Sequence, residues 1–484
     1  MKVDVGILAF GAYIPRRRLQ RSSIFAANGW FNPGLKGLAK GERAVASWDE
    51  DVITMAVEAS RDCLGETDRT LVRRVVLAST TAPFADRLNA GVVKEALNLP
   101  DEIDAVDSSG SQRAGTSALR QLLEGAATSP ALCIAAELRR ARPASEGELV
   151  QGDAAAAVLV GPGHPIARYL GGASLTTDFV DHFRSRFNEF DYSWESRWIR
   201  DEGYARLIPS AIKQGLAAAG VAPAQVDHLV VPIAARNVAL DIAKKAGIAV
   251  TAVVDGLGAQ LGDTGVAHPL VMLASVLEAA SPGQTIMVVG FGQGCDVLLF
   301  QVTEAVVAHP KPQGVSGWLE RRSEETNYLR HLFFSGLLDL DKGMRAEMDQ
   351  KQPLTALYRN RKAVLGLVGG RSKKTGTVQF PRSEISVDPN DRTSGTQEDY
   401  PLAEKRARLL TYTADNLTYS PDPPQYYGMI EFEGGGRMMA EIVDADPDEI
   451  AVGKLLTMMF RIKSTDDRRG FVKYFWKAVP ERNT

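Results

Sequence analysis

Residues 115–137, GTSALRQLLEGAATSPALCIAAE, have a counterpart later in the chain. Residues 265–290 read GVAHPLVMLASVLEAASPGQTIMVVG. In both stretches an amphipathic helical pattern contains a Leu-Glu pair and ends at Ser-Pro, and an apolar run typical of a buried strand follows. Two copies of one helix–strand unit predict two similar α/β halves packed together. The alternative is a chance similarity between two amphipathic units.

Around these stretches, residues 1–305 alternate short apolar runs with amphipathic helical segments. This alternation predicts a layered α/β fold in which most strands are buried. We expect strands at 74–78, 131–135, 153–160, 229–231, 285–289 and 296–300, and helices that include 51–64 and 114–127.

After about residue 308 the pattern changes. HPKPQG at 309–314 has the composition of a linker, and 318–348 has a charged, amphipathic helical pattern. From residue 353 onward, period-two alternation is interrupted by glycine and proline turns, which predicts a small β-barrel. We therefore place an α/β domain at 1–308 (halves at about 1–165 and 166–308), a bridging helical segment at 309–352 and a barrel-containing domain at 353–484.

Composition excludes several classes of protein. The 484 residues carry a net charge of −3, so the chain lacks a basic footprint for nucleic acid or for a membrane surface. The layout of the N-terminus is not that of a signal peptide, and no apolar stretch approaches the ~20 residues of a membrane span. The three cysteines have no paired spacing. We expect a cytoplasmic protein without nucleic-acid or membrane partners.

Several ordered motifs resemble hydroxymethylglutaryl-CoA (HMG-CoA) synthases of the archaeal and bacterial type. They are GAYIPRRRL at 11–19, the Glu-Arg, Asp-Glu-Asp and Thr-Met-Ala groups within 42–59, DSSGSQRAGTSAL at 107–119 and GDAAA at 152–156. The resemblance, which extends to ketoacyl synthase III, implies a thiolase-like five-layer αβαβα fold with duplicated halves. It also implies coenzyme A (CoA) or an acyl-CoA as substrate or co-substrate, no tightly bound cofactor, and a homodimer.

The C-terminal part resembles the OB-fold domain that accompanies thiolase-like enzymes acting on acyl-CoA. That family usually carries a zinc ribbon before its barrel. Here Ser372 and Thr375 stand where the first cysteine pair of the ribbon would be. Neither residue offers the thiolate that a structural zinc needs, so we expect no metal.

The resemblance further implies a catalytic cysteine at the start of a buried helix, assisted by a glutamate, a histidine and an asparagine. Gln112 stands at the cysteine position, Thr80 at that of the glutamate, Pro232 or Ile233 at that of the histidine, and Asp263 at that of the asparagine. A glutamine amide donates and accepts hydrogen bonds but forms no acyl-enzyme.

Three functional readings therefore stay open. In the first, the chain cleaves or forms a C–C bond in an acyl-CoA or β-oxoacyl substrate without an acyl-cysteine, by retro-Claisen or retro-aldol chemistry. In the second, it is a non-catalytic scaffold or partner subunit. In the third, it is a decarboxylating or acyl-transferring enzyme like the ketosynthases.

Three side chains are predicted to be catalytic. Gln112 can place its amide against a thioester carbonyl, and Asp263 can act as a general base. His268 lies about one helical turn beyond Asp263 and titrates near neutrality, so it can share the proton transfers. The structural alternatives are a helix cap for Gln112, a turn aspartate for Asp263 and a buried core histidine for His268.

Other residues are predicted to surround the substrate. The glycine turn that contains Gly292 and Gly294 follows the last strand of the second half, and its N–H groups can complete an oxyanion hole. Arg113 can meet a substrate carboxylate, or form a salt bridge instead. The aromatic and charged segment 178–204 is expected to cover the site or to contact a second subunit. We also expect substrate contacts from Thr80, His182 and Tyr192.

Overall fold

The computed structural model describes residues 4–125, 129–185, 187–234 and 236–482. Packing divides the chain into two compact units. The last boundary between them lies between Ser335 and Gly336, within the predicted bridging segment. The first unit comprises Met1–Ser47, Asp51–Gly91 and Pro100–Ser335, and the second comprises Trp48–Glu50, Val92–Leu99 and Gly336–Thr484. Among the described residues, none of the helices combines the length and apolarity needed to cross a membrane.

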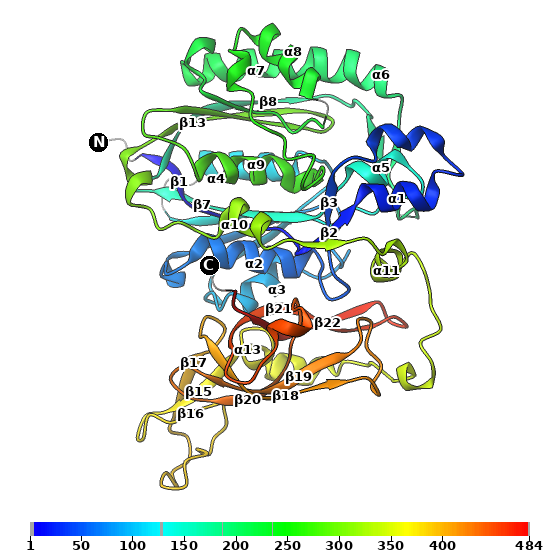
Figure 1. Cartoon of the computed structure of the whole chain (residues 1–484). Coiled ribbons are helices and arrows are strands. Elements are labelled where there is room, and N and C mark those ends of the chain that lie inside the picture. Colours follow the sequence, from blue (N-terminus) through cyan, green and yellow to red (C-terminus); the bar gives the residue numbers. More distant parts are fainter. Residues whose placement is uncertain (1–3, 126–128, 186, 235, 483–484) are drawn as a thin grey trace. The chain divides into compact units, whose positions relative to one another are not determined.

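The first unit has the predicted five-layer arrangement of helices and sheets (Figure 1). Two helices lie between two layers of sheet, and further helices cover the outer faces. From top to bottom in Figure 1 the layers are α7 (Ala205–Ala219) with α8 (Arg236–Ala246), β8 (Ala167–Thr176) with β13 (Gly294–Val302), α4 (Ala114–Gly125) with α9 (His268–Leu277), β1 (Val5–Tyr13) with β7 (Ala154–Pro162), and α2 (Val52–Leu64).

Strand pairing confirms the internal repeat. The strand order is β11-β12-β13-β8-β1-β7-β6-β4-β5. From β1 outward, β7 and β6 join antiparallel and β4 joins parallel; from β8 outward, β13 and β12 join antiparallel and β11 joins parallel. The two halves therefore share one topology. The strands not yet located are β4 (Arg74–Ala78), β5 (Asp104–Ser108), β6 (Ala131–Glu137), β11 (His228–Val230) and β12 (Thr285–Phe291).

The two central helices come from the repeated stretches. In α9 every residue except Ser275 is buried, because sheet layers lie on both sides of this helix. In α4 one glycine allows a close approach. A Cβ atom on Gly115 would lie 2.8 Å from the carbonyl oxygen of Val266, just before α9. The repeated helix–strand units thus build the middle of the fold.

The bridging segment differs from the continuous helical pattern predicted for 318–348. Two short helices, α10 (Gly314–Glu320) and α11 (Tyr328–Phe334), are separated by β14 (Ser323–Glu325). β14 pairs in parallel with β2 (Arg17–Gln20). The buried carboxylate of Glu325 accepts a hydrogen bond from Arg17 Nη1 at 2.8 Å. A charged residue that fits the solvent face of a helix is here held by a partner distant in sequence.

The second unit contains the predicted small β-barrel. Its strand order is β20-β19-β18-β21-β22, and a bridge between Ile442 and Ala478 joins the segment after β20 to β22. Trp476, Phe460 and Phe432 are among its largest buried side chains. The barrel strands are β18 (Ala407–Asp415), β19 (Gln425–Phe432), β20 (Arg437–Glu441), β21 (Leu455–Asp466) and β22 (Phe471–Pro480).

A three-stranded sheet, β15 (Val368–Ser372), β16 (Val378–Gln379) and β17 (Gln397–Pro401), lies in the region that resembles the frame of a zinc ribbon. The Ser372 hydroxyl donates to Asp391 Oδ2 at 2.6 Å, and the Thr377 hydroxyl donates to Asp388 Oδ2 at 2.8 Å. Hydrogen bonds from Ser372 and Thr393 lower the pKa of Asp391 to about 2. Hydroxyl–carboxylate pairs hold this loop, and such residues do not fit a structural zinc.

Candidate functional site

The turn before α4 meets the ends of β4 and β6. Gln112 lies in this turn, and its Nε2 donates to the Thr80 hydroxyl oxygen at 3.4 Å. The Thr80 hydroxyl donates in turn to Glu137 Oε1. The Thr80 N–H and the Ser79 hydroxyl donate to Glu137 Oε2 at 2.9 and 3.1 Å. Parallel pairing of β4 with β6 brings their carboxyl ends together and so produces this chain of contacts.

Glu137 is the buried end of that chain. Its side chain is fully buried, and this burial raises its pKa, while the hydrogen bonds from Thr80 and the nearby charge of Arg139 work in the opposite direction. The Thr80 hydroxyl therefore uses its only proton in the hydrogen bond to Glu137. This arrangement favours a positioning role for Thr80 toward Gln112 over the predicted direct contact with substrate.

A second network is ionic. Arg139 Nη1 contacts Asp263 Oδ2 at 3.2 Å, and Arg139 Nη2 contacts Asp191 Oδ2 at 2.8 Å. Arg184 Nη1 contacts the other oxygen of Asp191 at 2.8 Å, and its Nη2 donates to the Thr80 carbonyl oxygen at 2.6 Å. Two alternating Arg–Asp pairs thus connect the predicted base with the Gln112–Thr80 contact.

Asp263 is held ionised at the edge of this network. Its Oδ1 accepts the Gly265 N–H at 2.9 Å. Burial of Asp263 acts to raise its pKa, but the charge of Arg139 keeps this pKa below its ordinary value. The side chain still exposes 34% of its surface, so a ligand can reach the carboxylate. An accessible ionised carboxylate can accept a proton, and its lowered pKa makes it a weaker base than an isolated aspartate.

His268 lies at the start of α9 and is buried. Burial lowers its pKa, so the ring is neutral near pH 7. Its Nδ1 lies 3.3 Å from the backbone N of Thr264, which donates to it, and the ring also bonds the backbone of Gly256. Both ring nitrogens have partners, which favours support of the Asp263 turn over the predicted proton transfer.

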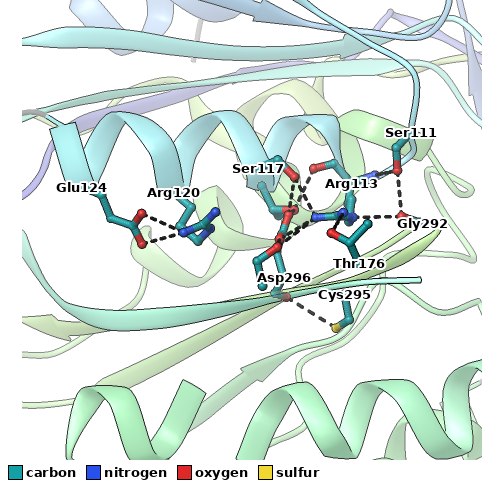
Figure 2. Close-up of polar contacts among 11 residues, drawn as sticks. Ser111, Arg113, Ser117, Arg120, Glu124, Thr176, Gly292, Cys295 and Asp296 are labelled. Atoms are coloured by element: carbon teal, nitrogen blue, oxygen red, sulfur yellow. Dashed lines mark hydrogen bonds and ion pairs between the residues drawn. The ribbon is translucent and has the colours of Figure 1, made fainter. Parts of the chain in front are cut away.

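Arg113 is engaged entirely within the chain (Figure 2). Its Nη1 forms a salt bridge with the buried Asp296 at 2.8 Å. Its Nε donates to the Gly292 carbonyl oxygen at 3.0 Å, and its Nη2 donates to the Thr176 hydroxyl at 2.9 Å. With a partner on each of these nitrogens, Arg113 fixes α4 to β13, an arrangement that favours the salt-bridge alternative over a substrate carboxylate.

The glycine turn lies beside the Gln112 turn. The Ser111 hydroxyl donates to the Gly292 carbonyl oxygen at 2.8 Å (Figure 2). A Cβ on Gly292 would lie 3.0 Å from the backbone nitrogen of Gln112. However, the Gly292 N–H donates to the Gly294 carbonyl oxygen at 3.0 Å, which favours turn closure over an oxyanion contact. The role of the Gly294 N–H stays a prediction.

The aromatic segment 178–204 reaches the site through its hairpin of β9 (His182–Phe183) and β10 (Tyr192–Ser193). This segment supplies both Arg184 and Asp191. His182 Nδ1 lies 3.1 Å from Asp181 Oδ2, and His182 is one of the groups that act to lower the pKa of Asp263, so it lies near the predicted base. Tyr192 is 57% exposed and contacts the Phe183 ring.

All three cysteines are buried and free. Burial raises the pKa of Cys133 to about 12, and it also raises the pKa of Cys63 and Cys295. None of them supplies a thiolate at neutral pH. Cys295, which directly follows the glycine turn, is fully buried and lies in a hydrophobic core cluster.

The structure therefore brings Gln112, Thr80, Asp263 and His182 to one region. The residues that connect them, Glu137, Arg139, Arg184 and Asp191, were not predicted from the sequence. One signal was available: ELRRAR at 137–142 directly follows a buried strand, where the fold collects functional side chains.

Fold and site together define a thiolase-like α/β protein with a C-terminal OB-fold domain. Residues 216–299 match the family described as 3-oxoacyl-[acyl-carrier-protein (ACP)] synthase III C terminal. Residues 400–461 match the family described as ChsH2, C-terminal OB-fold domain. Both matches agree with the resemblance found in the sequence.

More particularly, the chain is similar to hydroxymethylglutaryl-CoA synthases. It is 28% identical to that of Pyrococcus furiosus over 307 residues, 62% of this chain and 86% of the relative. It is 28% identical to that of Archaeoglobus fulgidus over 340 residues, 68% and 98% of the two chains. The structure of MvaS in complex with 3-hydroxy-3-methylglutaryl coenzyme A covers 70% of this chain and 93% of its own, with 21% identity and a TM-score of 0.61.

The 3-oxoacyl-(acyl carrier protein) synthase III (FabH) of Pseudomonas aeruginosa shares the fold at a TM-score of 0.54 and 19% identity, over 62% of this chain and 98% of its own. The likeness to both solved structures is one of fold.

Proposed function

We propose that this chain binds a CoA thioester at the Gln112 site and cleaves or forms a C–C bond without an acyl-cysteine. The relatives named hydroxymethylglutaryl-CoA synthase, and solved structures that hold CoA or its 3-hydroxy-3-methylglutaryl thioester, support the substrate class. The observation that carries the proposal is the replacement of a nucleophile by Gln112 in a turn whose neighbours form an organised polar network.

In this proposal Asp263 is the general base and Gln112 binds the reacting group, while His268 supports the Asp263 turn. In a retro-Claisen step the base takes the proton of the CoA thiol, whose sulfur attacks the β-carbonyl. In a retro-aldol step the base takes the proton of the β-hydroxyl. In both, the Cα–Cβ bond breaks and its electron pair passes to the thioester enolate, which is then protonated. The Gly294 N–H would stabilise that enolate.

The absence of an acyl-enzyme can be measured directly. After incubation with acetyl-CoA, intact-mass analysis should show the unmodified chain, because Gln112 is no nucleophile and the three thiols are protonated. The same chain, supplied with β-hydroxy acyl-CoA substrates, or with β-oxo acyl-CoA substrates together with free CoA, should show conversion to shorter acyl-CoA. A stoichiometric acetyl adduct would contradict the proposal, and absence of any conversion would favour the scaffold reading.

We also propose that the chain forms a homodimer through the edge of its sheet at β5. β5 is the outermost strand on its side, and Val106 in its middle is 46% exposed. An open strand edge with an exposed valine is suited to pairing with a second copy. Sedimentation should give a dimer for the natural chain and a monomer for Val106→Lys, and a monomeric natural chain would contradict this proposal.

A further inference from the structure

The orientation of the Gln112 amide follows from the partners of Thr80. The Thr80 hydroxyl donates its proton to Glu137, and its oxygen lies 3.4 Å from both Gln112 Nε2 and Arg184 Nη2. An oxygen whose proton is already donated can only accept further hydrogen bonds. The amide nitrogen of Gln112 therefore faces Thr80, and the amide oxygen points the other way.

That oxygen and a second buried polar atom both lack hydrogen-bond partners among the described residues. One is the acceptor Gln112 Oε1, and the other is the donor Arg139 Nε. Gln112 Oε1 and the Arg139 side chain lie beside Gly265, because a Cβ there would be 2.6 Å from Gln112 Oε1 and 3.1 Å from Arg139 Cδ, the atom bonded to Nε. The Arg139 side chain is only 10% exposed, and its other two nitrogens already contact Asp191 and Asp263.

We infer that Gln112 Oε1 and Arg139 Nε form a subsite for a hydroxyl group of the substrate, which selects β-hydroxyacyl thioesters over β-oxoacyl thioesters. The inference rests on the proposed binding of CoA thioesters and names their acyl class.

In the bound ground state a hydroxyl satisfies both atoms, because it donates a hydrogen bond to Gln112 Oε1 and its oxygen accepts the Arg139 N–H. The proposed retro-aldol step then moves that proton to Asp263. A carbonyl oxygen can accept from Arg139 but leaves Gln112 Oε1 unpaired. A methylene satisfies neither atom. Since a buried polar atom without a partner is costly, each missing contact should weaken binding by about 10-fold.

Isothermal titration calorimetry with four ligands tests the inference. They are the two enantiomers of 3-hydroxybutyryl-CoA, acetoacetyl-CoA and butyryl-CoA. The natural chain should bind one hydroxy enantiomer at least about 10-fold more tightly than acetoacetyl-CoA, and more tightly still than butyryl-CoA. Equal affinities would mean that only an ordered water fills the subsite and would overturn the inference, as would the binding of none of the four.

Two variants assign the preference to Gln112. Gln112→Met removes the acceptor at similar side-chain length and should abolish the preference, whereas Gln112→Glu keeps an acceptor oxygen and should retain it. A preference that survives Gln112→Met would overturn the inference. If Gln112→Met does not fold, the ligand ratios of the natural chain decide alone. A hydroxy preference without any turnover would contradict the proposed reaction but not this subsite.

Discussion

Asp263→Asn should lower kcat at least about 100-fold, because the amide cannot take a proton and a general base typically contributes 10²–10⁴-fold. KM should change much less, since the variant keeps the shape of the side chain and an oxygen for the Gly265 N–H. Steady-state kinetics on an acyl-CoA substrate that the natural chain converts measures both quantities. A kcat within about threefold of the natural value would place the base elsewhere, with His182 as the next residue to test.

Asp255→Asn is a matched control. Its carboxylate also accepts the N–H two residues ahead, that of Leu257 at 3.0 Å, but it lies on the exposed surface. This variant should keep natural kinetics.

The pH profile of the natural chain gives a second readout on Asp263. Because Arg139 keeps the pKa of Asp263 below its ordinary value, the base stays ionised and kcat/KM should show no loss from about pH 8 down to about pH 5. An acidic limb near pH 6–7 would indicate a histidine base.

Asp296→Ala should reduce the free energy of unfolding by about 3–5 kcal/mol, because it leaves the Arg113 charge buried without its counterion. The fully buried Asp296 carboxylate also accepts a hydrogen bond from Ser117 at 2.5 Å (Figure 2). A second comes from Ser174 at 2.6 Å. Stabilities of natural domains are of the order of 5–15 kcal/mol, so this loss is large. Urea denaturation followed by circular dichroism measures it.

Glu124→Ala provides the comparison on the same helix. Glu124 pairs with Arg120 at 2.7 Å and is 47% exposed (Figure 2). An exposed pair contributes at most about 1 kcal/mol, so this variant should stay close to the natural stability. Equal losses for Asp296→Ala and Glu124→Ala would contradict the role given to burial.

Much of the fold was predictable from local patterns. The strand predicted at 74–78 coincides with β4, and the helix predicted at 51–64 is α2 with Asp51 as its N-cap. The repeat between 115–137 and 265–290 anticipated the two equivalent halves. Hydrophobic periodicity depends on near neighbours in sequence, so such elements can be recognised without knowing the tertiary structure.

The local sequence pattern did not predict the strand whose partner is distant in the chain. The residues of β14 carry charges compatible with a helix, but they pair with β2, about 300 residues earlier in the chain. The partner's backbone, rather than the local sequence, decides the conformation there.

The sequence by itself determined the α/β halves, the barrel and the replacement of the expected cysteine by Gln112. Only the tertiary structure decided which polar groups meet. It paired Arg113 with Asp296, gave His268 two partners, and joined Arg139 to both Asp191 and Asp263. An arginine in a sequence carries a charge but no indication of its counterion. That choice is made when strand order and hairpin position bring distant segments within hydrogen-bond distance.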